Sequence, residues 1–541
     1  MFLLETAGSL DKIFSESGVS IPENKGLTMK NERYNFQVAA FSRWETKLGC
    51  KLKFTTELLP YITVRNVEYA KGTFNLAEEH DDGYIFLCDD VRPYPDVLTP
   101  VDSLGLTLRP NMWTVFYITV DNVKITGDFP ILITLTDEND NKLAKTEYSL
   151  RIIDRELPQN NIFITQWIYP DCVCNVHKVE PFSFAFYKIY NEYLRTYILH
   201  GGNTLYTPLF TPPLNTEIGG ERLTTQLIDV ELKNGEYKFD FQKLDRFIDN
   251  AIEMGIVNFE FSHFATQWGA EFCPKIIAKK GNSTIRIFGW DTKSDSAEYL
   301  QFLKVFLPAL KNYLKNKKQI EKCFFHISDE PHAEHKEKYQ TIKEILKNEL
   351  SEYEFLDALS NYDFYRQKLI DIPVVAINHY PEFKDNCKNL WVYYCMEQTS
   401  ENLTNRFLDM PLIRLRILGI QLYFNGIQGF LHWGFNFYNN YNSTKSINPY
   451  YITDAGGVFP SGDSFIVYPG KESVLDSIRL ETFGEAIKDY RLLLLLEKKY
   501  SREFVMQFLK EKGFYGFTVY PSNPTVFKEI INTLHEMTEK I

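Results

Sequence analysis

The stretch FFHISDEP, residues 324–331, decides how the rest of the chain is interpreted. Its first residues form a short apolar run typical of a buried strand, and Pro331 has a fixed φ and no N–H with which to extend a sheet. We therefore predict a strand over 323–329 that ends on two adjacent carboxylates, Asp329 and Glu330. Adjacent acids also suit a helix N-terminus or a solvated turn, so the surrounding pattern has to decide between these interpretations.

That pattern is an alternation of strands and helices that begins after Pro158. It predicts a parallel (β/α)8 barrel over 158–470, in which side chains at the carboxyl ends of the strands form the catalytic face. A doubly wound α/β sheet is the alternative, but no glycine-rich phosphate loop follows the first strand. The expected strands are 162–168, 204–209, 257–263, 323–329, 354–358, 374–378, 390–395 and 428–433. The expected helices include 184–198, 241–254, 298–314, 339–350 and 410–424.

The segments on either side of the barrel have different patterns. From about residue 33 to residue 154, β-branched and aromatic runs alternate with turn residues, which predicts an N-terminal β-sandwich over 1–157. The acidic run 137–141 is interpreted as a hairpin turn, with a calcium site as the alternative. An amphipathic pattern over 478–499 predicts a helix, and 471–541 is expected to form a helical cap. Within it, Arg479 and Asp489 are interpreted as a structural ion pair or as helix-terminal charges.

Composition limits the class of protein. The chain has 541 residues, of which 44% are hydrophobic and 24% charged, enough for two or three soluble domains. Its net charge of −12 argues against nucleic acid or an anionic membrane as the main partner. The eight scattered cysteines suit reduced thiols, and the N-terminus lacks a signal-peptide pattern, so we expect a cytoplasmic protein. The oligomeric state stays open.

Adjacent acids at a broken strand end suggest hydrolysis of a glycosidic bond. One acid protonates the departing oxygen, and a second group stabilises the positive charge at the anomeric carbon. In conventional retaining enzymes the two acids normally come from different strands, because their carboxyl groups must lie ~5 Å apart on opposite sides of the bond. Neighbours on a regular strand point to opposite faces, so Asp329 and Glu330 can share one pocket only where the strand breaks up. Adjacency therefore favours the substrate-assisted variant, in which the sugar's own 2-acetamido oxygen attacks. Asp329 would orient the acetamido group, and crowding would keep Glu330 protonated as the general acid/base.

Four motifs follow one another along the chain: HISDEP at 326–331, GFLHW at 429–433, VYPG at 467–470, and SIRL at 477–480 followed by DY at 489–490. In these motifs the chain resembles glycoside hydrolase family 123 and the related domain-of-unknown-function family 4091. The resemblance covers the barrel and the tail. It implies a β-N-acetylgalactosaminidase that acts on a glycan or glycoconjugate by substrate assistance, with the Asp329–Glu330 pair in the roles argued above.

Other side chains near the carboxyl ends of expected strands are predicted to contact the substrate. Trp433 would support the apolar face of the sugar. Tyr393 would hydrogen-bond the acetamido carbonyl, with Tyr394 as its rival because alternation sends only one of them inward. The remaining candidates, for each of which a structural role is equally open, are Asn203, His263, Trp268 and Trp167. His326 is interpreted as a residue of the barrel interior that hydrogen-bonds a neighbour.

Metal binding and a different type of chemistry are also considered. The motif DCVCNVH at 171–177 matches zinc spacing poorly, so no metal and no cofactor are expected. A retaining glycosidase for sugars without an acetamido group stays open, and it would need a second carboxylate, such as Glu397 or Glu260, facing Glu330. A non-hydrolytic glycan-binding protein and an interaction scaffold with an unrelated pocket stay open as well.

Overall fold

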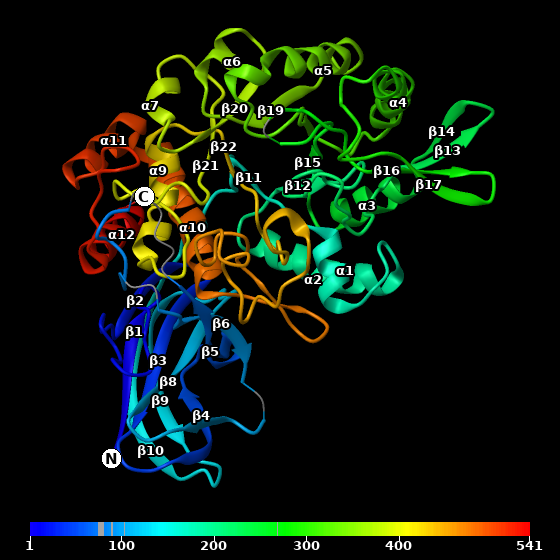
Figure 1. The fold of residues 1–541 in the computed structure, drawn as a ribbon. Helices are drawn as coiled ribbons and strands as arrows, with labels where there is room; N and C mark the ends of the chain where they lie inside the picture. Colours follow the sequence, from blue (N-terminus) through cyan, green and yellow to red (C-terminus); the bar gives the residue numbers. More distant parts are fainter. Residues whose placement is uncertain (74–79, 88–89, 102, 268, 541) are drawn as a thin grey trace.

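A computed structural model describes residues 1–73, 80–87, 90–101, 103–267 and 269–540 of the chain. Figure 1 shows a sheet-rich N-terminal region in blue and cyan at the bottom, a barrel above it, and the C-terminal helices, in orange and red, beside the barrel. Within the described residues, no helix combines the length and the apolar character that a bilayer crossing requires.

The N-terminal region contains two five-stranded sheets with a hydrophobic core that includes Phe36, Ile118 and Ile133. Neighbouring strands are antiparallel except β2 and β10, which are parallel. The first sheet contains, in spatial order, β1 (Phe2–Gly8), β3 (Tyr34–Ser42), β8 (Met112–Val120), β5 (Ile62–Gly72) and β6 (Arg92–Pro100). The second contains β2 (Lys25–Met29), β10 (Lys142–Ile153), β9 (Gly127–Thr136), β4 (Lys47–Thr55) and β7 (Leu106–Leu108). The acidic run forms the β9–β10 turn, where the Asp137 carboxylate accepts hydrogen bonds from two backbone N–H groups.

The second part of the chain forms an eight-stranded parallel sheet that curls into a nearly closed barrel. All eight expected strands are present, and they follow one another around the barrel in chain order. They are β11 (Phe163–Gln166), β12 (Thr204–Thr207), β15 (Asn258–Phe261), β18 (Lys322–Phe325), β19 (Glu354–Ala358), β20 (Ile372–Ala376), β21 (Trp391–Tyr393) and β22 (Gly429–His432).

β11 and β12 are the two end strands of this sheet, and Asn203 joins them. Its backbone N–H donates to the Ile164 carbonyl, its side-chain oxygen accepts from the Ile164 N–H at 2.8 Å, and its side-chain nitrogen donates to the Ile162 carbonyl at 2.9 Å. The Tyr197 hydroxyl lies 2.8 Å from the Ile164 oxygen and 2.6 Å from the Thr204 oxygen. Asn203 immediately precedes Thr204, so it lies at the amino end of β12.

Helices surround the barrel, and two of the long ones begin at the serines expected of N-caps. The Ser183 and Ser296 hydroxyls accept from backbone N–H groups three residues ahead. The single helix expected over 410–424 is two helices, α8 and α9, which meet at Ile417. The helices are α1 (Pro170–His177), α2 (Phe184–Leu199), α3 (Gln242–Glu253), α4 (Ala297–Asn316), α5 (Lys336–Glu349), α6 (Tyr362–Arg366), α7 (Tyr380–Phe383), α8 (Leu412–Arg416) and α9 (Leu418–Phe424).

Two hairpins that the strand–helix alternation did not predict project from the barrel (Figure 1). They form one four-stranded sheet. Asn234 and Gly235 at the first turn have φ values of 54° and 83°, the left-handed pair that a two-residue hairpin turn requires. The strands are β13 (Asp229–Lys233), β14 (Glu236–Asp240), β16 (Ile276–Lys280) and β17 (Ser283–Phe288).

Three further helices, α10 (Ile478–Tyr500), α11 (Arg502–Glu511) and α12 (Pro524–Glu539), follow the barrel, after a small hairpin of β23 (Tyr468–Pro469) and β24 (Val474–Leu475). α10 packs so closely on α9 that a Cβ at Gly419 would lie 1.7 Å from the Ala486 carbonyl oxygen. The sequence suggested that Arg479 and Asp489 of α10 form an ion pair with each other or act as helix-terminal charges. They do not pair with each other. Arg479 binds Asp96 of β6 at 2.9 Å, and Asp489 binds Arg416 of α8 at 2.6 Å.

Candidate active site

The strand that carries the two acids is shorter than predicted. β18 ends at Phe325, four residues before Asp329, so the prediction that the strand reaches Asp329 is wrong. The cause is Asp357 on β19, whose carboxylate accepts hydrogen bonds from the Ile327 N–H at 3.1 Å and the Ser328 N–H at 3.3 Å. These N–H groups would otherwise pair with a strand, and a side chain that takes them ends the ladder.

Glu330 turns the chain back toward the barrel. Its φ of 45° is left-handed, which is uncommon for a residue with a Cβ, and its N–H donates to the Ala358 carbonyl at 2.9 Å. In a regular strand, Asp329 and Glu330 would point to opposite faces. Here the ladder has ended and the backbone turns at the second acid, so both side chains line one cavity.

This cavity has a volume of about 840 Å³ and is surrounded by the loops at the carboxyl end of the barrel. Small-molecule sites typically have volumes of roughly 300–1,000 Å³, so the space accommodates a sugar and part of the group to which it is attached. None of the described residues that line it is Lys or Arg. Its lining carboxylates are Asp329, Glu330, Asp363, Glu382, Glu397 and Asp463.

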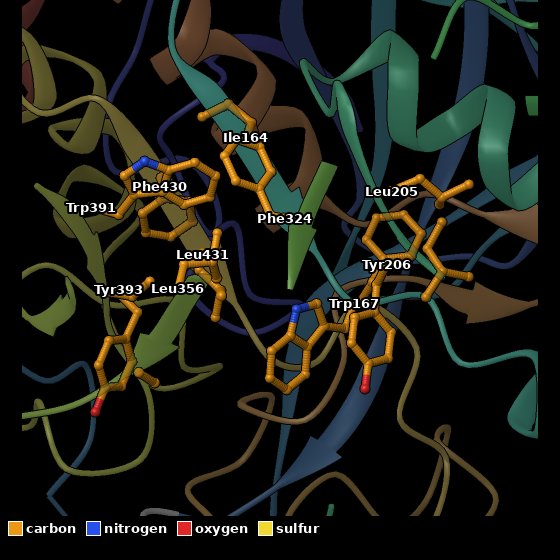
Figure 2. Packing of buried hydrophobic residues seen from close by; sticks show 14 of the residues in the cluster. Ile164, Trp167, Leu205, Tyr206, Phe324, Leu356, Trp391, Tyr393, Phe430 and Leu431 are labelled. Carbon is orange, nitrogen blue, oxygen red and sulfur yellow. The ribbon is translucent and has the colours of Figure 1, made fainter. Parts of the chain in front are cut away.

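Tyr393 and Tyr394 point in different directions, as strand alternation requires. Tyr393 lines the cavity, and its hydroxyl donates to Glu330 Oε1 at 2.6 Å. Tyr394 packs against the rings of Phe430 and His432. Figure 2 shows the Tyr393 hydroxyl directed away from the packed rings of Trp391 and Phe430. Tyr393 is therefore the tyrosine of this strand that can contact a ligand.

Trp433 lines the cavity together with Asp463, which sequence reasoning missed. The Trp433 indole N–H donates to Asp463 Oδ2 at 3.1 Å, and Asp463 Oδ1 lies 3.5 Å from Nε2 of the buried His432. Burial raises the pKa of Asp463 to about 7. A signal for it was present in the sequence, because the long Gly- and Asn-rich segment after the last strand is of a kind that usually serves a site.

The other predicted contacts are divided between the cavity and the protein interior. Trp167 lines the cavity and stacks on Tyr206, at a ring distance of 4.8 Å (Figure 2). His263 is buried and is absent from the lining, and Asn203 lies at the opposite end of β12. Trp268 lies outside the described residues, although Gln267 before it lines the cavity.

Beneath the acid pair, His326 is buried between two carboxylates. Its Nε2 lies 2.5 Å from Glu260 Oε1 and its Nδ1 lies 2.9 Å from Asp357 Oδ1. Burial lowers the pKa of His326, but the hydrogen bonds and charges of Asp357 and Glu260 outweigh it and raise the pKa to about 9. His263, His326 and Asp357 could together surround a cation, since their ligand atoms lie within 4.8 Å of one another. In this arrangement, however, both His326 nitrogens are already occupied by carboxylates.

The two acids differ in their surroundings. Burial and the neighbouring Glu330 charge raise the pKa of Asp329 well above its ordinary value. The sequence led us to expect that crowding would raise one pKa of the pair, and in the structure the pKa of Asp329 is raised. On the other side of the cavity, burial and the Glu330 charge also raise the pKa of Glu397. The cavity is thus an acidic site in which at least one carboxyl group keeps its proton to unusually high pH.

The residues of the DCVCNVH motif have other partners. Asp171 binds the buried Arg222 at 2.8 Å, and the Cys172 sulfur accepts from the Tyr438 N–H. His177 Nε2 lies 3.0 Å from the Tyr193 hydroxyl. The motif forms α1, and its side chains hold the helix against its neighbours.

A parallel barrel with carboxylates and aromatic rings at the carboxyl end of its strands is typical of enzymes that act on sugars. Comparison with known families agrees: the model of the glycoside hydrolase 123 catalytic domain matches residues 167–496, more than half of the chain. The chain belongs to glycoside hydrolase family 123. It is therefore a glycosidase, and its substrates are glycans.

A solved structure of the same family has the same fold. A family 123 glycoside hydrolase from Clostridium perfringens, solved in a study of glycolipid glycan hydrolysis, is similar over 100% of this chain and 98% of that chain, with a TM-score of 0.75 and 15% identity. A β-glucuronidase from Parabacteroides merdae is similar over 90% of this chain and 52% of that one, with a TM-score of 0.33 and 9% identity. A search of the curated proteins found no match.

Proposed function

We propose that this glycosidase removes terminal β-linked N-acetylhexosamine, with N-acetylgalactosamine as the sugar, by substrate-assisted retaining catalysis. The observation that carries the proposal is that two sequence neighbours, Asp329 and Glu330, line one cavity. Acids that share a backbone turn are too close to stand on opposite faces of a sugar ring. They suit a reaction in which the nucleophile belongs to the substrate. The choice of N-acetylgalactosamine follows from the motifs that resemble family 123.

In the proposed reaction, Asp329 accepts a hydrogen bond from the acetamido N–H, and the acetamido oxygen attacks the anomeric carbon. The bond to the leaving oxygen breaks as Glu330 gives that oxygen its proton, which leaves a cyclic oxazolinium intermediate. The Glu330 carboxylate then takes a proton from water. The water oxygen attacks the anomeric carbon and displaces the acetamido oxygen, which restores the open acetamido group. The configuration at the anomeric carbon is retained.

Three cavity residues support this reaction by their position. The Tyr393 hydroxyl, bonded to Glu330 in the ligand-free enzyme, is free to bind the acetamido oxygen once Glu330 holds a proton. The Trp433 ring offers an apolar surface to the sugar. Asp463 lines the cavity, and its carboxylate can accept a hydrogen bond from a sugar hydroxyl.

The proposal is tested with matched aryl β-glycosides that carry or lack the 2-acetamido group. We expect wild type to hydrolyse the acetamido sugar at least about 100-fold faster than the plain galactoside, because only the former contains the nucleophile. Asp329→Asn should lower kcat on the acetamido sugar by ~10²–10⁴-fold, the range of a lost acid or base function. Equal turnover of the two sugars would remove substrate assistance.

A second candidate, a retaining glycosidase for sugars without an acetamido group, is favoured by one observation: Glu397 lines the same cavity as Glu330. The other sequence candidate, Glu260, binds His326 and the Trp167 indole N–H and is absent from the lining. Glu397→Gln distinguishes the two reactions. A nucleophile role predicts near-complete loss of activity and covalent labelling of Glu397 by a 2-fluoro sugar. Substrate assistance predicts no labelling and a loss below about tenfold.

A further inference from the structure

The buried cluster beneath the acid pair has no role in the reaction proposed above. Glu260, His326 and Asp357 all have side chains that are 0% exposed. An imidazole that faces a carboxylate oxygen at each nitrogen needs a proton on both, because both contacts require a donor. The geometry therefore describes an imidazolium between two carboxylates, with a net charge of −1.

Further hydrogen bonds fix the two carboxylates in place. Glu260 also accepts from the Thr165 hydroxyl at 2.5 Å and from the Trp167 indole N–H at 2.7 Å. Asp357 accepts from the Tyr339 hydroxyl at 2.6 Å, and from the two backbone N–H groups that lead into the catalytic pair. The cluster thus connects β11, β15, α5 and β19 to the segment that carries the acids.

Few other groups near His326 can change charge. His263 stacks on it with ring centroids 4.0 Å apart, and burial and the His326 charge lower the pKa of His263 well below its ordinary value, so His263 is neutral. The Trp167 ring approaches from β11 and carries no charge. Among the described residues, Tyr339 is bonded to Asp357, and Asp329 lies three residues along the chain from His326. The charges of His326, Asp357 and Glu260 all act on Asp329, so a change in the charge of the cluster changes the ionisation of Asp329.

The members of the cluster act on Asp329 with opposite signs. The positive charge of His326 lowers the pKa of Asp329, whereas the charges of Asp357 and Glu260 raise it. In the proposed reaction, Asp329 has to be ionised to receive the acetamido N–H, and Glu330 has to hold the proton. Two adjacent acids share such a proton, and the nearby charges decide which of them holds it.

We propose that His326 is a positioning residue whose positive charge, maintained by Glu260 and Asp357, favours ionisation of Asp329 and so shifts the shared proton of the acid pair toward Glu330. This inference rests on the proposed function. A substrate in the cavity does not contact His326, which is buried. In this proposal His326 nevertheless controls the protonation state of the acid pair.

The test compares the pH dependence of kcat/KM in two variants. His326→Gln removes the positive charge, so Asp329 ionises less readily and the acid limb moves to higher pH, by about one unit, with kcat lowered about 10- to 100-fold and KM changed less than about threefold. Glu260→Gln removes a negative charge while Asp357 still holds the imidazolium, so the acid limb moves to lower pH. If His326 had only a packing role, the acid limbs of the two variants would shift in the same direction, or neither would shift.

A direct measurement accompanies the kinetics. In ¹⁵N-histidine NMR spectra of wild type, we expect both His326 nitrogens to stay protonated up to about pH 9. If circular dichroism shows that His326→Gln does not fold, the pH profile of Glu260→Gln and these spectra still test the proposal. The matched control is His535→Gln, a buried histidine of α12 bonded to the Ile531 carbonyl, which should leave the profile unchanged.

Two outcomes overturn the proposal. One is a His326 ring that loses a proton below pH 7. The other is an acid limb that shifts in the same direction in both variants, or that shifts in neither. The profiles are recorded on whichever aryl glycoside the wild type hydrolyses. Failure of the acetamido specificity therefore appears in the wild type alone, and failure of the His326 role appears in the direction of the variant shifts.

Discussion

Tyr393 shows how one hydroxyl can serve two steps. In the ligand-free enzyme it donates to Glu330 Oε1 at 2.6 Å. A protonated Glu330 needs no such donor, and the hydroxyl then becomes available to the substrate. In the proposed reaction, the same side chain thus contacts the acid in one state and binds the sugar in the other.

Tyr393→Phe should therefore lower kcat about 10- to 100-fold on the acetamido glycoside, since one hydrogen bond to a developing charge is typically worth about 1.5–3 kcal/mol. Steady-state kinetics on folded protein measure this. Tyr394→Phe is the matched control on the adjacent residue, whose ring packs away from the cavity, and should change kcat less than about threefold. Equal losses in both variants would contradict a specific role for Tyr393.

At the scale of elements, Asn203 helps to hold together β11 and β12, the two end strands of the barrel sheet. This residue was predicted to bind substrate, yet its side chain bonds to the backbone of β11 at Ile162 and Ile164. Asn203→Ala should lower the free energy of unfolding by about 2–4 kcal/mol, because it leaves buried backbone groups without partners. kcat measured on the folded fraction should stay within about twofold.

Urea denaturation and the same aryl glycoside assay measure both quantities. The control is Asn191→Ala, which removes a side-chain pair between Asn191 of α2 and Asn250 of α3 on the outside of the barrel. Its cost in stability should be smaller. A rise in KM for Asn203→Ala without loss of stability would restore the substrate-contact interpretation.

The sequence predicted regular elements well and the ends of strands poorly. Local patterns identified all eight barrel strands, because apolar runs and turn residues are local signals. β18 ends early because the Asp357 carboxylate, about 30 residues further along the chain, accepts a hydrogen bond from the Ile327 N–H just beyond the strand. The hairpin at Asn234-Gly235 had a recognisable turn signal, but its strands are short and charged. Long-range side-chain contacts also place Asp463 at the cavity, and no local pattern contains them.

At the scale of the whole molecule, α10 connects the N-terminal sheets to the barrel through buried ion pairs. Glu481 is bound by Arg33 and Arg65 of the N-terminal region, each at 2.5 Å. Burial raises the pKa of Glu481, but the charges of the two arginines outweigh it and hold the pKa well below its ordinary value. The ionised carboxylate is therefore part of what holds the two parts together.

Glu481→Gln should destabilise the protein at pH 7 by about 1.5–3 kcal/mol, because the buried Arg65 and the half-buried Arg33 lose their shared carboxylate and keep only Asp476 and Asp121. A group with a lowered folded-state pKa contributes stability above its unfolded pKa of about 4.5, and this contribution is lost as the pH falls further. The difference in Tm between wild type and variant should therefore narrow below about pH 4.5. Calorimetry at pH 7 and at acidic pH measures it, and a constant difference would contradict the assignment.

Arg479 connects the N-terminal sheets to the loop that contains Asp463. Its guanidinium holds Asp96 of β6 on one side and the carbonyl oxygens of Gly462 and Phe465 on the other, and these two residues flank Asp463 of the cavity. A protein engineer who trimmed the enzyme to its barrel would release the anchor of the loop that completes the sugar pocket. Miniaturised versions of this catalyst therefore have to retain the N-terminal sheets or replace Asp96 with another acceptor for Arg479.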